Sequence, residues 1–198
     1  MRHTIAHYIK NCNTYIWIKL ACHAPYGLLK LLEVPVRRWS SISLDLITRL
    51  PTSNSYDILL VMVDRLSKIT YYIPTTMYVT FRGMASLYFD YIFHLHGIPD
   101  SVVSDWGTQF VLEFTRALCN LTGTKQNLST SFHPQIDSQT KCVNALVEQY
   151  LCGYCNYQQD NWTKLLTMAE FLYNNNLSSS TGITPFFAMY REHPRYLI

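Results

Sequence analysis

The chain contains 198 residues, of which 48% are hydrophobic and 15% are charged, so it can bury a sizeable core without disulfides or metal ions. Its formal net charge of +3 is small and its basic residues are scattered, which favours a polyanionic partner only weakly. The sequence shows neither a run of about 18 apolar residues nor a secretory leader, which excludes a membrane-spanning protein and predicts a soluble, intracellular domain.

The six cysteines are expected to be reduced thiols, because no leader directs the chain to an oxidising compartment. Cys152 and Cys155 have the spacing of a redox pair or of half a zinc site. A redox motif should follow a strand and open a helix, whereas this pair lies inside a helical pattern. A structural role is therefore favoured.

Three apolar runs, over residues 41–48, 56–64 and 68–74, are separated by short polar turns and predict an antiparallel meander. Asp45 lies in the middle of the first run, where a carboxylate costs free energy unless a cation or hydrogen-bond donors meet it. Both a functional carboxylate and one satisfied by backbone amides fit this position. Asp64 ends the second run beside a turn and is no catalytic candidate.

Helices and strands alternate in the second half of the chain. Residues 101–105 form a short apolar strand with Asp105 at its carboxyl end, where ligand sites gather in open α/β sheets. A further strand is expected over residues 125–130. Apolar residues at helical spacing predict helices over 80–96, 108–122, 139–156 and 161–175.

Four stretches follow one another along the chain: SISLDLITRLP at Ser41–Pro51, SDWGTQF at Ser104–Phe110, HPQIDSQTKCVN at His133–Asn144 and TGITPFF from Thr181. In this order they resemble motifs of the integrase catalytic core of gypsy-class LTR retrotransposons, a group of retroviral-type integrases. This resemblance covers roughly residues 39–195 and implies an α/β, ribonuclease H-like fold with a mixed five-stranded sheet flanked by helices.

The resemblance assigns the catalytic aspartates to Asp45 and Asp105 and the catalytic glutamate to position 141, where this chain has Lys141. Enzymes of this family transfer DNA strand ends with two divalent cations held by such carboxylates. Protonated Lys141 cannot coordinate a cation, but it can pair with Asp45 or Asp105 and hold the site together. Binding of Mg²⁺ or Mn²⁺ by Asp45 and Asp105 is therefore expected to be weakened or lost, and catalysis impaired. Glu148 lies about 10 Å further along the helix, too far to replace the glutamate.

The resemblance also implies contacts with the phosphate backbone of DNA, from Lys125, Ser131, Gln135 and Asn144. DNA and further copies of the chain are the expected partners, in the nucleus, with neither a membrane nor a small-molecule substrate. The alternatives are a module that binds nucleic acid or protein without catalysis, and an inert relic.

The first residues resemble the end of the family's zinc-binding module. Cys12 matches one cysteine of that module and Tyr15 stands at the other, while His3 and His7 are spaced to share a helix face. No zinc is therefore expected. Residues 1–34 are interpreted as a truncated remnant of that module plus a linker, and residues 35–198 as the core-like domain, without the family's C-terminal DNA-binding barrel.

Many departures from the family wording share one property: each can arise from a single C-to-T or G-to-A transition. This suggests a transition-mutated copy of a transposable element. The positions are Tyr15, Arg49, Trp106, Ile136, Ser138, Lys141, Cys142 and Arg191.

Overall fold

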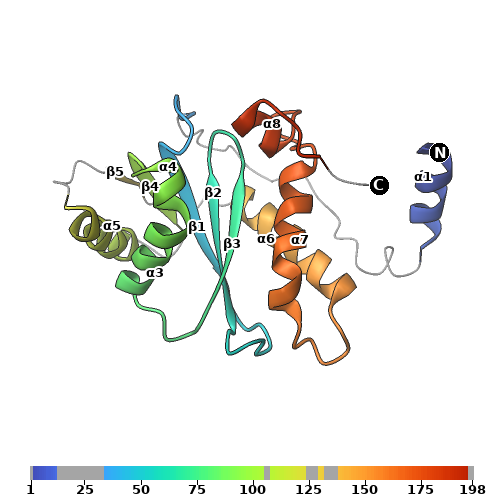
Figure 1. The fold of residues 1–198 in the computed structure, drawn as a ribbon, viewed down its shortest axis with the longest axis horizontal. Helices are drawn as coiled ribbons and strands as arrows, with labels where there is room; N and C mark the ends of the chain where they lie inside the picture. Colours follow the sequence, from blue (N-terminus) through green and yellow to red (C-terminus); the bar gives the residue numbers. More distant parts are fainter. Residues whose placement is uncertain (1, 13–33, 105–107, 124–128, 132–137, 196–198) are drawn as a thin grey trace.

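A mixed sheet forms the centre of the protein in the computed structural model, which describes residues 2–12, 34–104, 108–123, 129–131 and 138–195 (Figure 1). The strand order is β3-β2-β1-β4-β5. Strand β1 pairs antiparallel with β2 and parallel with β4, and β2 pairs antiparallel with β3. The strands are β1 (Ser41–Ile47), β2 (Ile58–Asp64), β3 (Thr70–Thr75), β4 (Ser101–Ser104) and β5 (Ser129–Ser131).

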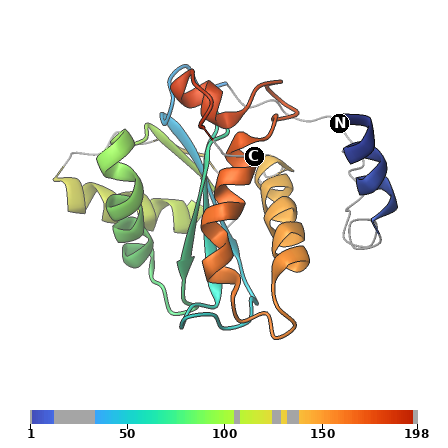
Figure 2. The same cartoon turned by 45° about the vertical axis from the view of Figure 1, so that its right-hand side comes forward.

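Helices cover both faces of the sheet. Figures 1 and 2 show α3, α4 and α5 on one side of it and α6 and α7 on the other, with α8 above the sheet in Figure 1. None of the described helices is both long and apolar enough to cross a membrane. The helices are α1 (Arg2–Asn11), α3 (Phe81–Tyr88), the π-helix η1 (Phe89–Phe93), α4 (His94–His96), α5 (Thr108–Thr122), α6 (Ser138–Tyr154), α7 (Trp162–Asn175) and α8 (Pro185–Tyr190).

Strand β2 is buried on both faces and joins the two halves of the core. Because successive side chains of a strand point to opposite faces, Leu60 and Met62 pack in the core on the α3 and α5 side. Leu59 and Val61 pack in the core on the α6 and α7 side. The continuous apolar run of β2 is therefore explained by two helical layers and not by one.

Strand β1 alternates between apolar and polar side chains, and this alternation positions the candidate site. Ile42, Leu44 and Leu46 belong to the core on the α3 and α5 side. The intervening residues Ser43 and Asp45 therefore point to the opposite face, which α6 and α7 cover. The α/β prediction, with a mixed sheet flanked by helices and an antiparallel meander, is confirmed.

The structure differs from the sequence-based elements in three places. The helix expected over 80–96 is three consecutive helical segments with a π-helical turn in the middle. Of the strand expected over 125–130, residues 129 and 130 lie in β5, and residues 124–128 lie outside the described part of the chain. Helix α8 was not predicted, although Thr184 caps it by accepting a hydrogen bond from the Phe187 backbone, with Pro185 in the first turn.

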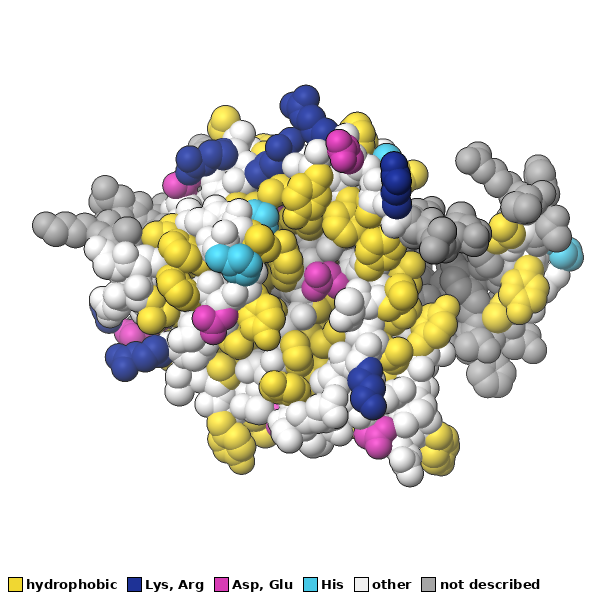
Figure 3. Space-filling model, in the orientation of Figure 1, with side chains coloured by type: hydrophobic (Ala, Val, Ile, Leu, Met, Phe, Trp, Pro, Cys, Tyr) yellow, Lys and Arg dark blue, Asp and Glu magenta, His cyan; other side chains and the backbone are white. Residues whose placement is uncertain are grey.

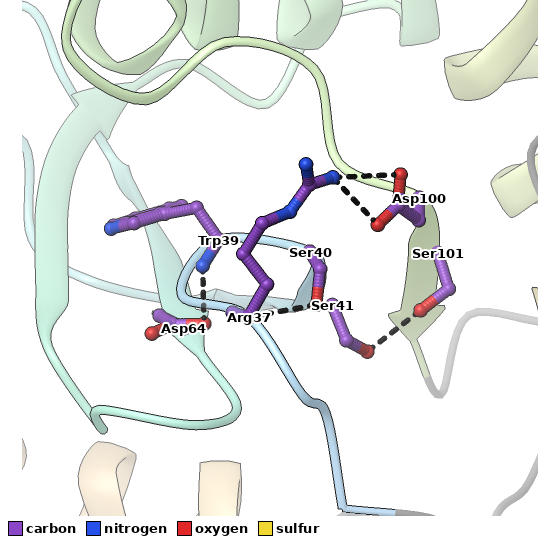
Figure 4. A network of polar contacts seen from close by, with 7 residues as sticks. All are labelled: Arg37, Trp39, Ser40, Ser41, Asp64, Asp100 and Ser101. Atoms are coloured by element: carbon purple, nitrogen blue, oxygen red, sulfur yellow. Dashed lines mark hydrogen bonds and ion pairs between the residues drawn. The ribbon is translucent and has the colours of Figure 1, made fainter.

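The carboxylate of Asp64, at the end of β2, is fully buried and fixes the start of the sheet (Figure 4). Its Oδ1 accepts a hydrogen bond from the backbone nitrogen of Trp39 at 3.0 Å. Its Oδ2 accepts from the backbone nitrogen of Ser67 at 2.9 Å and from the Ser67 hydroxyl at 2.6 Å. Asp64 therefore joins the segment before β1 to the β2–β3 turn, which confirms its predicted role at a turn.

A second set of contacts joins the start of β1 to the start of β4. The Ser101 hydroxyl donates to the Ser41 hydroxyl at 2.7 Å, and the Ser40 carbonyl accepts from the backbone nitrogens of Asp100 and Ser101. Arg37 forms a two-pronged ion pair with Asp100 (Figure 4), but both side chains are mostly exposed. The buried carboxylate of Asp64 and the exposed carboxylate of Asp100 therefore allow a comparison of their contributions to stability.

We expect D64A to lower the free energy of unfolding by about 3 kcal/mol, because it leaves buried backbone and hydroxyl donors without an acceptor. D100A should cost less than about 1 kcal/mol, because an exposed ion pair contributes little. Urea unfolding of both variants measures the difference. Equal losses would show that Asp64 does not have the role assigned to it.

Candidate active site

Asp45 is the described carboxylate of the candidate site and is held by two donors. Its side chain is 7% exposed, on the face of β1 that α6 covers. The backbone nitrogen of Leu46 donates to its Oδ1 at 2.8 Å. The amide nitrogen of Asn144, in α6, donates to its Oδ2 at 2.6 Å. These bonds provide part of the solvation that a carboxylate loses inside a sheet.

Helix α6 brings Asn144 to Asp45 because its apolar face is anchored on the sheet. Val143 and Val147 are buried in the core on this side, together with Val61 of β2. The half-buried Asn144 follows Val143 directly, at the edge of that apolar face. Its Oδ1 is buried and has no hydrogen-bond partner among the described residues. The side chain therefore directs its donor to Asp45.

Lys141 lies in α6, three residues before Asn144. Residues three apart on a helix lie on the same face, about 4.5 Å apart along the axis. Position 141 therefore lies on the face of α6 that carries Asn144 toward Asp45. Glu148 lies a turn beyond Asn144 in the other direction and is exposed. Nothing in its position brings it to Asp45.

The remaining predicted site residues are described only in part. Asp105, Lys125 and Gln135 lie outside the described residues, although β1 and β4 pair Leu44 with Ser104, the residue before Asp105. Ser131 ends β5, where it pairs with Val103 of β4. The DNA contacts of Lys125, Ser131, Gln135 and Asn144 stay predictions. The contact between Asn144 and Asp45 was missed, although their motifs had already been assigned to one site.

The described part of the site does not by itself form a complete magnesium site. It offers one carboxylate, Asp45, and the Asn144 amide nitrogen donates to its Oδ2 at 2.6 Å. No group of three or more His, Cys, Asp or Glu side chains within the described ranges could hold a metal ion. Hard cations need several oxygen ligands, and Asp45 alone supplies too few of them.

Cys152 and Cys155 are free thiols at the end of α6 and just after it. Burial raises the pKa of the Cys155 thiol, and the neighbouring Cys152 raises it further by a smaller amount. A redox-active cysteine needs a lowered pKa, so this environment disfavours redox chemistry. The predicted position of this pair within a helical pattern is confirmed for Cys152.

The chain is similar over nearly its whole length to part of a transposon polyprotein. The Tf2-3 and Tf2-4 transposon polyproteins of Schizosaccharomyces pombe are each 31% identical to it over 194 residues, which make up 98% of this chain and 15% of each polyprotein. The chain is thus homologous to Tf2 retrotransposon polyproteins and spans about 15% of their length. No protein-family model matches the chain.

The fold is similar to that of solved integrase catalytic cores. The HTLV-2 integrase catalytic core domain in complex with magnesium matches in its trimeric form with a TM-score of 0.53 and 18% identity, over 78% of this chain and 99% of that one. Its dimeric form matches with a TM-score of 0.54 and 21% identity, over 79% and 99%. A chain of the simian T-cell lymphotropic virus intasome in complex with PP2A regulatory subunit B56 gamma matches with a TM-score of 0.55 and 16% identity, over 100% and 71%. The chain therefore has the fold of an integrase catalytic core.

The bond between Asn144 and Asp45 predicts a pH-dependent response to N144D. The new carboxylate would face Asp45 at about the 2.6 Å that now separates the amide nitrogen from Oδ2, and two carboxylates so close cannot both ionise. We expect the variant to lose about 2 kcal/mol of stability, relative to the parent, between about pH 4 and pH 7. Q149E, which introduces the same charge on α6, serves as the control in the same urea unfolding series. Parallel pH profiles for N144D and Q149E would contradict the assigned contact.

Proposed function

We propose that the chain is the integrase domain of a gypsy-class LTR retrotransposon, with a ribonuclease H-like core over residues 35–198, and that its strand-transfer activity is impaired at Lys141. In such enzymes two divalent cations activate the attacking hydroxyl and stabilise the leaving oxygen. The observation that carries this proposal is Asp45, a carboxylate buried in β1 and facing the helix that contains Lys141. The similarity to Tf2 polyproteins and the integrase-core fold support it.

In this proposal, the positive charge of Lys141 replaces that of a divalent cation at the catalytic site. We assign to Lys141, on the helix that also carries Asn144, the neutralising role of a cation toward Asp45 and Asp105. In this proposal the ion pair holds β1 and α6 together, so the fold persists while Mg²⁺ or Mn²⁺ binding is weakened or lost. A buried carboxylate left without a countercharge would instead destabilise the domain.

The family expectation further places the domain in the nucleus, acting on DNA as a homo-oligomer. The HTLV-2 core is known in dimeric and trimeric forms, which supports self-association here. Residues 1–34 are proposed to be a remnant of a zinc-binding module and a linker that binds no zinc.

Restoring the carboxylate tests the catalytic part of the proposal. We expect K141E to show Mg²⁺- or Mn²⁺-dependent strand transfer or disintegration at least about a hundredfold above the parent, equivalent to about 2.7 kcal/mol of transition-state stabilisation. The assay uses the purified chain with a labelled DNA substrate that resembles a joined end. K164E makes the same charge change at an exposed position of α7 and should stay as inactive as the parent. Activity of the parent itself would contradict the assignment of Lys141 as the lesion.

DNA binding without catalysis is the second candidate function. It is favoured by a positive charge at position 141, where the catalytic enzymes carry a negative one, because phosphate contacts need no bound metal ion. Such contacts position DNA without reading its sequence. An inert relic would keep the fold and bind DNA no better than an unrelated protein of equal charge.

Salt dependence separates DNA binding from an inert fold. We expect retention of a DNA duplex to weaken steeply with salt, and K125A to reduce the slope of log K against log salt by about one unit, because it removes one phosphate contact. K164A removes a lysine from the exposed surface of α7 and should leave the slope unchanged. If both variants behave alike, Lys125 makes no phosphate contact.

A further inference from the structure

Strand β3 is an edge strand whose outer side is covered by side chains of α7. The sheet order ends at β3, so every second backbone N–H of that strand points away from β2. An exposed strand edge of this kind can pair with another chain. Figures 1 and 2 both show α7 beside β3, and the polar contacts between them are specific.

Two residues of α7 satisfy the outward-facing backbone of β3. Asn174, which is 2% exposed, accepts from the backbone nitrogen of Thr70 at 2.9 Å and donates to its carbonyl at 2.8 Å, as a neighbouring strand would. Glu170 Oε2 accepts from the backbone nitrogen of Tyr72 at 2.8 Å. The next outward position is Pro74, which has no N–H. The outer edge of β3 therefore depends on two side chains of α7, and Glu170 is the one that titrates.

The four-residue spacing of α7 explains how one helix covers both the sheet face and its edge. Trp162 and Leu166 are buried in the core on this side of the sheet. Glu170 and Asn174 continue the same row of side chains, since residues four apart lie on one helix face. The apolar part of the row packs on the sheet and the polar part reaches the edge of β3.

Glu170 is held in mostly apolar surroundings. Burial raises the pKa of its carboxyl group to about 7, although the hydrogen bond from Tyr72 acts in the opposite direction. The described titratable groups that interact with it are the phenols of Tyr71 and Tyr72 in β3. Tyr173 of α7 acts on Tyr72, and Tyr190 of α8 is hydrogen-bonded to Tyr71. Burial also raises the pKa of Tyr71 and Tyr72, so both are neutral near pH 7. Figure 3 shows apolar side chains over the middle of the face that carries β3 and α7, with Lys and Arg mostly toward its rim.

We propose that Glu170 makes the attachment of α7 to the edge of β3 dependent on protonation, closed when its carboxyl group is neutral and more often open when it is charged. In the open state Glu170 is in water and regains its ordinary acidity. Because the closed state binds the proton more tightly, its stability is fully present below about pH 4.5 and is lost as pH rises through about 7. Opening exposes the outer backbone edge of β3 to solvent.

Amide hydrogen exchange of the full chain by NMR tests this proposal between pH 5 and pH 8, after correction for the intrinsic exchange rate at each pH. We expect the protection factors of the Thr70 and Tyr72 amides to fall by up to about a hundredfold over this range, because both amides lose their α7 acceptors together. The amide of Val61, in the interior strand β2, serves as the control for global unfolding and should change far less.

The matched variant is E170Q, which keeps an oxygen to accept from Tyr72 but cannot become charged. Its Thr70 and Tyr72 amides should keep the same protection at all pH values of the series. Constant protection in the parent would overturn the proposal, as would an equal fall in E170Q. A fall at Tyr72 alone would also overturn it, because it would show release of one side chain without opening of α7.

Discussion

The buried carboxylate of Asp64 fixes the geometry on which the rest of the sheet depends. It binds the backbone of Trp39, just before β1, and that of Ser67 in the β2–β3 turn, so the first strand and the hairpin beside it keep one register. The ring of Trp39 stacks on the ring of His96 with 4.3 Å between their centroids, and this contact joins the surroundings of Asp64 to α4. Burial lowers the pKa of His96 to about 4, and the smaller, opposite effect of Asp64 does not offset it. The stacked ring is therefore neutral near pH 7. Asp64 thus joins the segment before β1, the β2–β3 turn and the ring pair of Trp39 and His96 at one junction.

That register decides which face of β1 meets α6. The apolar residues of β1 pack under α3 and α5, so Asp45 must point to the other face, and Asn144 reaches it from a helix anchored by Val143 and Val147. Asp45 accepts hydrogen bonds from the backbone of its own strand and from Asn144 of α6. The described interactions that build the sheet around Asp45 are therefore packing of β1 and α6 and hydrogen bonds from Leu46 and Asn144.

The local sequence pattern predicted most helices and strands, whereas contacts between residues distant in sequence could not be predicted from it. The alternation of β1, the apolar run of β2 and the turn position of Asp64 could be read from neighbouring residues. Edge coverage by Glu170 and Asn174 could not, because it depends on how α7 lies against β3, about a hundred residues away in sequence. The bond between Asn144 and Asp45 has the same origin. The motif resemblance assigned both residues to one site, but no spacing rule states that an amide hydrogen-bonds to the carboxylate.

We infer that position 141 decides whether this site holds a divalent cation. The most direct test is urea unfolding of the parent and K141E with and without millimolar Mn²⁺ or Mg²⁺. A cation that binds only the folded state raises stability by RT ln(1 + [M]/Kd). We expect no change for the parent and a gain of more than about 1 kcal/mol for K141E. Equal stabilisation of both proteins would contradict a deciding role of position 141, because the site would then bind the cation without the carboxylate.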